Sequence, residues 1–387
     1  MEHPLLQSYG PLEGWHILLA IGVVSIGFFS YQVQKATRLV MLGSSDSRFD
    51  SWSIRIKEFI SGWLFQKKVL RDKVAGIMHV LMFWGFLMLS TDMFDLATAN
   101  AFSDKVLPEI IVGPWNGMVE LGYFMALIGC VSALTRRVVF TPEKLKGKSQ
   151  LEGNAILLLI FTITTTSFMV ESAESPSAFW EPIGYWFSER GLSEQTVILS
   201  YWAHMLAISV FLFLIPLSKH MHLVMAVPNV FFHDAGPMAR MRPLAIGDDG
   251  KAVPLEDLDI DSFGVSTYNQ YSWRQLIDGW SCTSCARCQD VCPAYASGKG
   301  LNPMQVIHDV RNYANEHAPI LLSGNQPEET ILERITEEAV WACTTCNACV
   351  DVCPLYIEHV PKLTDLRRNA MMETMEYPEV LLSLIHI

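Results

Sequence analysis

The chain has 387 residues, of which 50% are hydrophobic and 18% are charged, and its formal net charge is −12. Such an apolar composition excludes an ordinary soluble protein and predicts membrane spans, and the negative charge argues against a nucleic-acid partner. Long apolar runs dominate before Pro228, and acidic segments and cysteine motifs follow it. We therefore expect a membrane domain over residues 1–231, a linker over 232–271 and a soluble domain over 272–387.

Five apolar segments approach or exceed the roughly 20 residues that a helix needs to cross a bilayer. Between the first two, residues 52–65 carry apolar side chains at helical spacing, which predicts an amphipathic helix on the inner membrane surface. The five predicted transmembrane helices cover residues 15–40, 74–97, 113–134, 154–170 and 197–217.

The charges of the connecting loops predict the orientation. Residues 44–73 and 136–148 are rich in Lys and Arg, whereas residues 171–195 carry five glutamates against Arg190 alone. Basic loops stay in the cytoplasm. We therefore expect a multi-pass protein of a prokaryotic cytoplasmic membrane, with the N-terminus outside and the cysteine-rich part in the cytoplasm.

Histidines inside membrane spans are rare and are candidate functional residues. His204 and His222 are 18 residues apart, so on one continuous helix they would share a face and stand roughly 27 Å apart. Such a helix could serve two haems stacked across the membrane. A bis-histidine haem needs a second ligand, and His79 in the second span is the only good donor. Its depth fits either His222 or His204, and His204 could instead pair with His16; for each of them a purely structural role is the alternative.

Polar groups that could bind a quinone are few. Candidates at span ends or within spans are Asp92, Glu120, Glu171 and His204, and each is explained more simply by a structural role.

The fifth span, with His204, Pro216-Leu-Ser-Lys219, His222-Leu and Pro228, resembles the haem-b subunit of respiratory nitrate reductases. The resemblance covers residues 15–231 and implies that His79 pairs with His222 around the haem nearest the cytoplasm. The second histidine that this family carries on the same helix as His79 would fall at Leu89. This departure leaves the haem count at one or two.

Eight of the nine cysteines form two copies of the pattern C-x2-C-x2-C-x3-C-P. This spacing is typical of two [4Fe–4S] clusters, and the fourth cysteine of each run is expected to bind the other cluster. Two zinc sites would not need eight cysteines in this pattern, and disulfides are disfavoured in the cytoplasm. The predicted ligands are Cys282, Cys285, Cys288 and Cys292, then Cys343, Cys346, Cys349 and Cys353.

About 50 residues with helical patterns separate the two runs, which favours a helical ferredoxin over the small β type. The run from Cys282 to Lys299, followed by Leu301-Asn-Pro303, is similar to the iron–sulfur subunit of heterodisulfide reductase. We therefore predict an all-α fold, in which a bundle of five transmembrane helices precedes a cytoplasmic α-helical ferredoxin domain.

Taken whole, the chain resembles membrane-bound heterodisulfide-reductase-related iron–sulfur proteins. The resemblance implies electron transfer between quinone and a cytoplasmic redox protein through haem b and two clusters. Members commonly continue into a domain with cysteine-rich CCG motifs, which this chain lacks, so we expect a C-terminally truncated reading frame that has lost this electron outlet. One alternative is a haem-free anchor that tethers the clusters. A transporter or ion pump would need charged residues midway through its spans, and these are lacking.

Overall fold

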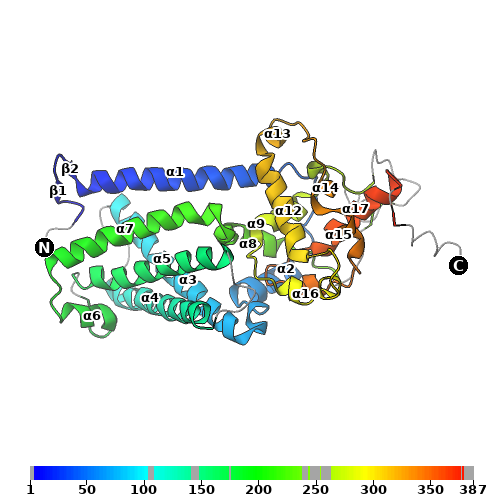
Figure 1. The fold of residues 1–387 in the computed structure, drawn as a ribbon. Coiled ribbons are helices and arrows are strands. Elements are labelled where there is room, and N and C mark those ends of the chain that lie inside the picture. Colours follow the sequence, from blue (N-terminus) through cyan, green and yellow to red (C-terminus); the bar gives the residue numbers. More distant parts are fainter. Residues whose placement is uncertain are drawn as a thin grey trace. The chain divides into compact units, whose positions relative to one another are not determined.

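The computed structural model describes residues 4–102, 109–140, 148–173, 176–237, 243–244, 253, 263–375 and 377–378; within these, the side chains of 92–102, 109–110 and 148–149 are left aside. The chain divides into two compact units. Unit 1 consists of Met1–Tyr31 and Val69–Ser218, and unit 2 of Gln32–Lys68 and Lys219–Ile387. Helix α1 (Gly14–Val40) contributes to both units (Figure 1).

Among the residues that the structure describes, five helices are long and apolar enough to cross a membrane, which confirms the predicted all-α architecture. They are α1, α3 (Lys73–Phe102), α4 (Glu109–Val138), α5 (Lys148–Glu171) and α7 (Glu194–Leu217). Within unit 1, α3 packs on α4, α4 on α5 and α5 on α7. Unit 1 also contains the short hairpin β1 (Ser8–Tyr9) and β2 (Leu12–Glu13), the 3-10 turn η2 (Val69–Arg71) and helix α6 (Pro182–Ser188).

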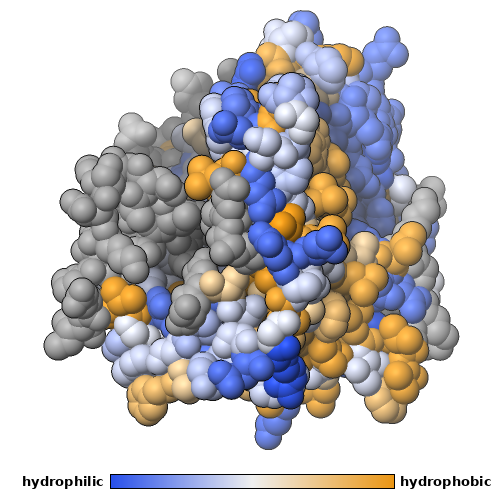
Figure 2. Space-filling view, turned by 90° about the vertical axis from the view of Figure 1, so that its left-hand side faces the viewer, coloured by the Kyte–Doolittle hydropathy of each residue, from blue (hydrophilic) through white to orange (hydrophobic). Residues whose placement is uncertain are grey.

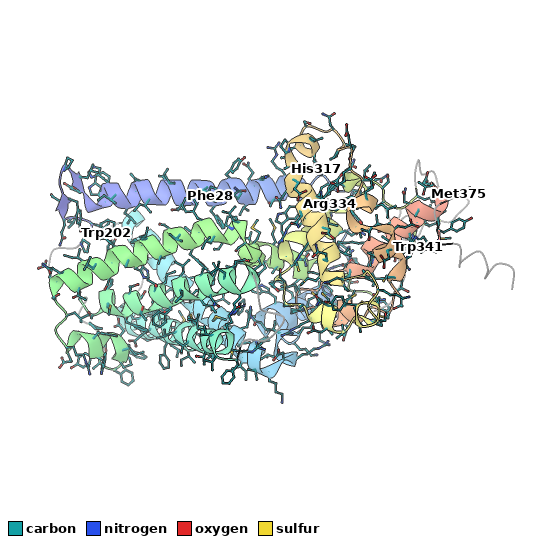
Figure 3. All side chains as sticks on the ribbon, in the orientation of Figure 1. Phe28, Trp202, His317, Arg334, Trp341 and Met375 are labelled. Carbon is teal, nitrogen blue, oxygen red and sulfur yellow. The ribbon has the colours of Figure 1, made fainter. Side chains whose placement is uncertain are left out.

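Glycines bring α3 and α4 into close contact. A Cβ added at Gly85 would lie 2.6 Å from the Gly122 carbonyl oxygen and 2.8 Å from the Ala126 nitrogen. Small residues are typical of contacts between membrane helices, because they let the two backbones approach. Aromatic rings join α1 to α7, where the Phe28 and Phe213 centroids are 4.7 Å apart (Phe28 is labelled in Figure 3).

Aromatic side chains are exposed at the end of unit 1 that carries α6. Phe179 is 78% exposed and Trp186 49%. Figure 2 views this end and shows hydrophobic residues interspersed with polar ones. Exposed aromatic residues beside polar ones are typical of the boundary between membrane and water.

The fifth span ends earlier than the continuous helix that we expected through His222. Helix α7 stops at Leu217, Ser218 is extended (φ −124°, ψ 179°), and a 3-10 turn, η4 (Lys219–Met221), precedes α8 (His222–Phe231). The break is made by the backbone of Ser218, which leaves the helical conformation after Pro216 and Leu217 have continued the helix. The prediction that His204 and His222 share one helix face was therefore wrong.

Unit 2 is built from many short helices around a large apolar cluster and a smaller one at Cys282 and Cys353. Leu276, Val310 and Tyr313 are among its fully buried side chains. Its elements are α2 (Trp52–Phe59), the π-turn η1 (Ile60–Leu64), η4, α8, η6 (Tyr268–Gln270), α9 (Trp273–Ser281), α10 (Arg287–Asp290), α11 (Pro293–Ala296), α12 (Pro303–Glu316), α13 (Ala318–Leu322), α14 (Ile331–Ile335), α15 (Glu337–Ala342), α16 (Ala348–Val352) and α17 (His359–Met372).

The helices before and after the first cysteine run, α9 and α12, begin at capping residues. The Ser272 hydroxyl accepts the Gln275 N–H at the start of α9, and the Gln275 side chain accepts the Ser272 N–H in return. Asn302 caps α12 through the Met304 N–H at 3.0 Å, and Pro303 occupies the first helical position. Both patterns satisfy N–H groups that have no partner inside the helix.

The segment 32–68 is an integral part of unit 2. Ser44 pairs with the backbone on either side of Ser272, through N–H···O bonds of 2.9 and 3.1 Å. Helix α2 and the π-turn η1, which follows it directly, together confirm the helix predicted over 52–65, and its position on a membrane surface stays a prediction. The predicted linker, 232–271, lies largely outside the described residues; its end is packed, with Tyr268 and Tyr271 fully buried.

Candidate iron–sulfur site

The two cysteine loops have the same unusual backbone. In each loop the residues on either side of the second cysteine are left-handed: Ser284 (φ 56°) and Ala286 (φ 61°) in the first, Thr345 (φ 54°) and Asn347 (φ 60°) in the second. None is glycine, and the left-handed conformation costs roughly 1–2 kcal/mol at Ser284, Ala286 and Thr345, and less at Asn347, because Asn tolerates it. Alternating right- and left-handed residues turn successive N–H groups toward one point, which is how backbones cradle anions and iron–sulfur clusters. Strain of this kind is typical of a functional site.

The folded chain gathers four thiols from both runs into one group, the Cys282 set: Cys282, Cys285, Cys288 and Cys353. Cys282 and Cys353 belong to one cluster of packed, buried side chains. Burial raises the pKa of Cys288, and the charges of Cys353, Cys282 and Cys285 raise it further, with the smallest contribution from Cys349. Burial likewise raises the pKa of Cys353 to about 12, with contributions from Cys285 and Cys282. Cys353 therefore joins the first run, although it ends the second.

The remaining four thiols form the Cys343 set: Cys343, Cys346, Cys349 and Cys292. All four line one cavity. Burial raises the pKa of Cys349 to about 12, and the charges of Cys343, Cys292 and Cys346 add to this effect. The two sets thus exchange their fourth cysteines, and the assignment of all eight as ligands stays a prediction.

The donors around these thiols suit a negatively charged cluster. The Thr345 N–H lies 3.4 Å from the Cys343 sulfur, and the Ser284 N–H bonds to Cys282 at the matching place. Backbone N–H groups of Leu355 and Ile357 bond to the sulfur of Cys353. Hydrogen bonds to the sulfurs stabilise and tune iron–sulfur clusters, so the residues present fit the group.

The cysteines of the two sets form no disulfide in the part of the chain that the structure describes. All nine cysteines, which lie among the described residues, have free thiols. Within the described part of the chain, no three His, Cys, Asp or Glu side chains converge closely enough to hold one ion. A cubane binds its four thiolates through separate irons, and these therefore stand further apart than the four ligands of a zinc ion.

The two sets differ in their exposure. Cys282, Cys288 and Cys353 are buried, whereas Cys346 of the other set is exposed. A group at the Cys343 set therefore lies nearer the surface of unit 2.

No pattern in the sequence indicates the buried ionic network that supports the Cys282 set. Arg274 and Asp278 of α9 are fully buried and 2.8 Å apart, and Lys362 of α17 bonds to the other Asp278 oxygen. Arg48 reaches Glu358 at 3.1 Å, and the Asp278 carboxylate accepts the Glu358 N–H at 3.2 Å. Buried charges need such partners, because removing an ion from water is costly. The network thereby fixes the chain just after Cys353.

His222, a predicted haem ligand, has an imidazole orientation that would suit metal binding. Its Nδ1 lies 2.9 Å from the Lys219 carbonyl oxygen, within the turn that precedes α8. If Nδ1 donates this bond, Nε2 is the atom available as a ligand; metal-binding histidines commonly have such a partner.

The other two predicted haem ligands lie in unit 1. His204 Nδ1 lies 3.0 Å from the Ile163 carbonyl oxygen and 3.1 Å from the Thr166 hydroxyl of α5. This geometry serves a structural histidine as well as a ligand. His79 is half-buried on α3.

Among the quinone candidates, Glu120 has a structural role. Its carboxylate accepts the N–H groups of Ile183 and Gly184 at 2.7 Å, and so caps the N-terminal end of α6. The side chain of Asp92 lies outside the described residues.

Comparison with known proteins identifies relatives. A family model described as a 4Fe-4S dicluster domain matches residues 274–354. Over 95% of its length the chain is 28% identical to the EtfAB:quinone oxidoreductase of Syntrophomonas wolfei, and it covers 58% of that protein. Over 92% of its length it is 27% identical to the probable iron-sulfur-binding oxidoreductase FadF of Bacillus subtilis, and it covers 55% of it.

A shorter match, over 27% of the chain, is 32% identical to one component of the ferredoxin:CoB-CoM heterodisulfide reductase of Methanosarcina mazei, and spans 53% of that component. No solved structure matches significantly. The chain thus spans a little over half the length of the relatives that it matches along most of its own length. It carries a 4Fe–4S dicluster domain and is related to iron–sulfur oxidoreductases, which confirms the predicted iron–sulfur resemblance; the fused cytochrome b stays a prediction.

Proposed function

We propose that this relative of iron–sulfur oxidoreductases passes electrons between the membrane quinone pool and a cytoplasmic redox protein. The observation that carries the proposal is the pair of four-thiol sets, each assembled from both cysteine runs. Two [4Fe–4S] clusters would supply one-electron carriers there, and the protein supplies position, hydrogen bonds and exclusion of water. The name of the Syntrophomonas relative supports quinone as one partner and an EtfAB-type protein as the other.

The two cysteine sets are expected to have different roles in electron transfer. The Cys282 set is buried and held by the ionic network, so its potential is defined by fixed dipoles rather than by water. The Cys343 set includes the exposed Cys346 and is the better placed of the two to exchange electrons with a separate protein.

Haem b completes the proposal on the membrane side, with His79 and His222 as ligands of one haem and His204 as the candidate ligand of a second. Support comes from the spacing around Pro216 and from the Nδ1 bond of His222 to Lys219. The basic loops favour a cytoplasmic position for the cysteine sets and an outer position for the N-terminus.

Replacing His79 or His222 by Ala is expected to remove the contribution of their shared haem to the α-band of a b-type cytochrome in reduced-minus-oxidised spectra of membranes, so persistence of the full band would reject these two ligands. The cluster signals in electron paramagnetic resonance (EPR) should persist, because neither histidine is a cysteine-set residue. His220→Ala is the matched control, since it changes a neighbouring histidine that is not a proposed ligand, and it should retain the band. A wild-type protein that has cluster signals and no α-band would instead be the haem-free anchor.

A further inference from the structure

We propose that the His308 imidazole donates a hydrogen bond to the Cys282 thiolate and thereby raises the reduction potential of the cluster at the Cys282 set. The proposal rests on the clusters of the proposed function and concerns a side chain that no cysteine pattern includes. His308 would act as a positioning and tuning residue, because it touches a ligand and not the iron.

The geometry comes from a rigid element. His308 Nε2 lies 3.6 Å from the Cys282 sulfur and 3.0 Å from the Ser284 hydroxyl oxygen. Its helix, α12, is capped by Asn302 and buries Ile307 and Val310 on either side of this position. The imidazole is therefore held against the first cysteine loop by the core of unit 2.

The chemistry favours sulfur as the acceptor when a cluster is bound. A thiolate is an acceptor only, whereas an imidazole N–H needs a partner once it is withdrawn from water. Cys282 already receives the Ser284 N–H, so His308 adds a second, side-chain donor to the same sulfur. Bonds to a charged acceptor are the stronger kind.

The Cys343 set has a different environment. Cys343 receives the matching backbone donor from Thr345, and the Arg367 guanidinium bonds to its carbonyl oxygen. His359 lines this cavity, but its Nδ1 lies 3.1 Å from the Ile357 carbonyl oxygen. Among the described residues, the contact from an imidazole nitrogen to a cysteine sulfur is the one made by His308.

The direction of the effect follows from charge. Reduction adds one electron to the cluster, breaks no bond, and leaves the proton on the imidazole. The reduced cluster is more negative, so a hydrogen bond to its thiolate stabilises the reduced form more than the oxidised form. Removing the donor must therefore lower the potential of that cluster.

The test is an EPR-monitored redox titration of the full chain in detergent. His308→Phe keeps an aromatic ring and removes the donor. It should lower the equilibrium constant for reduction of one of the two clusters about tenfold, which lowers the midpoint potential of that cluster by about 59 mV for one electron. His308→Gln retains an N–H donor, so its midpoint potential should lie between those of His308→Phe and the wild type. The shifted signal should be the one that survives when the Cys343 set is disabled by Cys349→Ala.

His317→Phe, at the residue that caps the C-terminal end of α12, is the control. Its Nε2 bonds to Glu329 at 3.0 Å, beside Arg334 (both His317 and Arg334 are labelled in Figure 3), so neither midpoint should move. Ser284→Ala is the variant to use if His308→Phe fails to bind the cluster. It leaves the Cys282 sulfur as the acceptor for the His308 N–H, so the midpoint potential of that cluster should stay the same or rise. A lower midpoint potential would show that the Ser284 hydroxyl is the donor to Cys282 and would overturn the proposal. Unchanged midpoints in His308→Phe would also overturn it, whereas a wild type without cluster signals would reject the proposed function itself.

Discussion

Cys292→Ala is expected to remove the cluster at the second cysteine run, although Cys292 ends the first. It lines one cavity together with Cys343, Cys346 and Cys349, so its loss leaves three ligands there. The cluster at the Cys282 set should survive. Iron content should fall to roughly half, and one of the two EPR signals should disappear, because each cluster needs four thiolates.

Cys353→Ala is the reciprocal variant and should remove the other signal. Cys130→Ala is the matched control, since its thiol donates to the Leu157 carbonyl oxygen at 2.9 Å, within unit 1, and it should retain all the iron. If Cys292→Ala removed the same signal as Cys285→Ala, each run would hold its own cluster, and the exchange of fourth cysteines would be wrong.

Asp278→Ala is expected to destabilise unit 2 by about 3–5 kcal/mol, which is typical when one partner of a buried ion pair is removed. The carboxylate bonds to both Arg274 and Lys362, and all three side chains are fully buried. Without it, two cations remain in the core with reduced compensation. The measurement is denaturant unfolding, followed by loss of the cluster absorbance.

Two comparisons isolate the charge. Lys362→Met added to Asp278→Ala should recover part of the loss, because it removes one of the uncompensated cations. Glu316→Ala, on the surface, removes a bond to Arg334 that Glu329 also makes, and should cost less than about 1 kcal/mol. If Glu316→Ala and Asp278→Ala lowered the free energy of unfolding equally, breaking the buried ion pair would cost no more than breaking one on the surface, and the prediction would be wrong.

The spans could be predicted because their signal is local. Each is a continuous apolar run, and the observed helices begin and end within several residues of the predicted ones, from Gly14–Val40 for the first to Glu194–Leu217 for the fifth. The cysteine runs were as easy to recognise, because three cysteines of each set come from one short loop.

The rest of the site depends on contacts between distant residues. Arg48 and Glu358 are 310 positions apart, and isolated charges in a sequence are usually assigned to the surface. His308 follows the first run by a whole helix turn and a loop, so no spacing rule connects it to Cys282. The expected continuous helix to His222 failed because the break is made by a single residue, Ser218, inside an apolar stretch, and such helix ends are hard to place from sequence.

Unit 2 cannot be completed in the order in which the chain is synthesised. Its early part, Gln32–Lys68, leaves the ribosome before the helices of Val69–Ser218. Yet the Lys68 ammonium donates a hydrogen bond to the Val350 carbonyl oxygen, and the Lys68 carbonyl oxygen accepts one from the Arg287 guanidinium. Residues 32–68 therefore cannot reach their final contacts while the intervening spans enter the membrane. Neither four-cysteine set is complete until both cysteine runs have been synthesised. Insertion of the clusters is therefore a late step in the biogenesis of this protein.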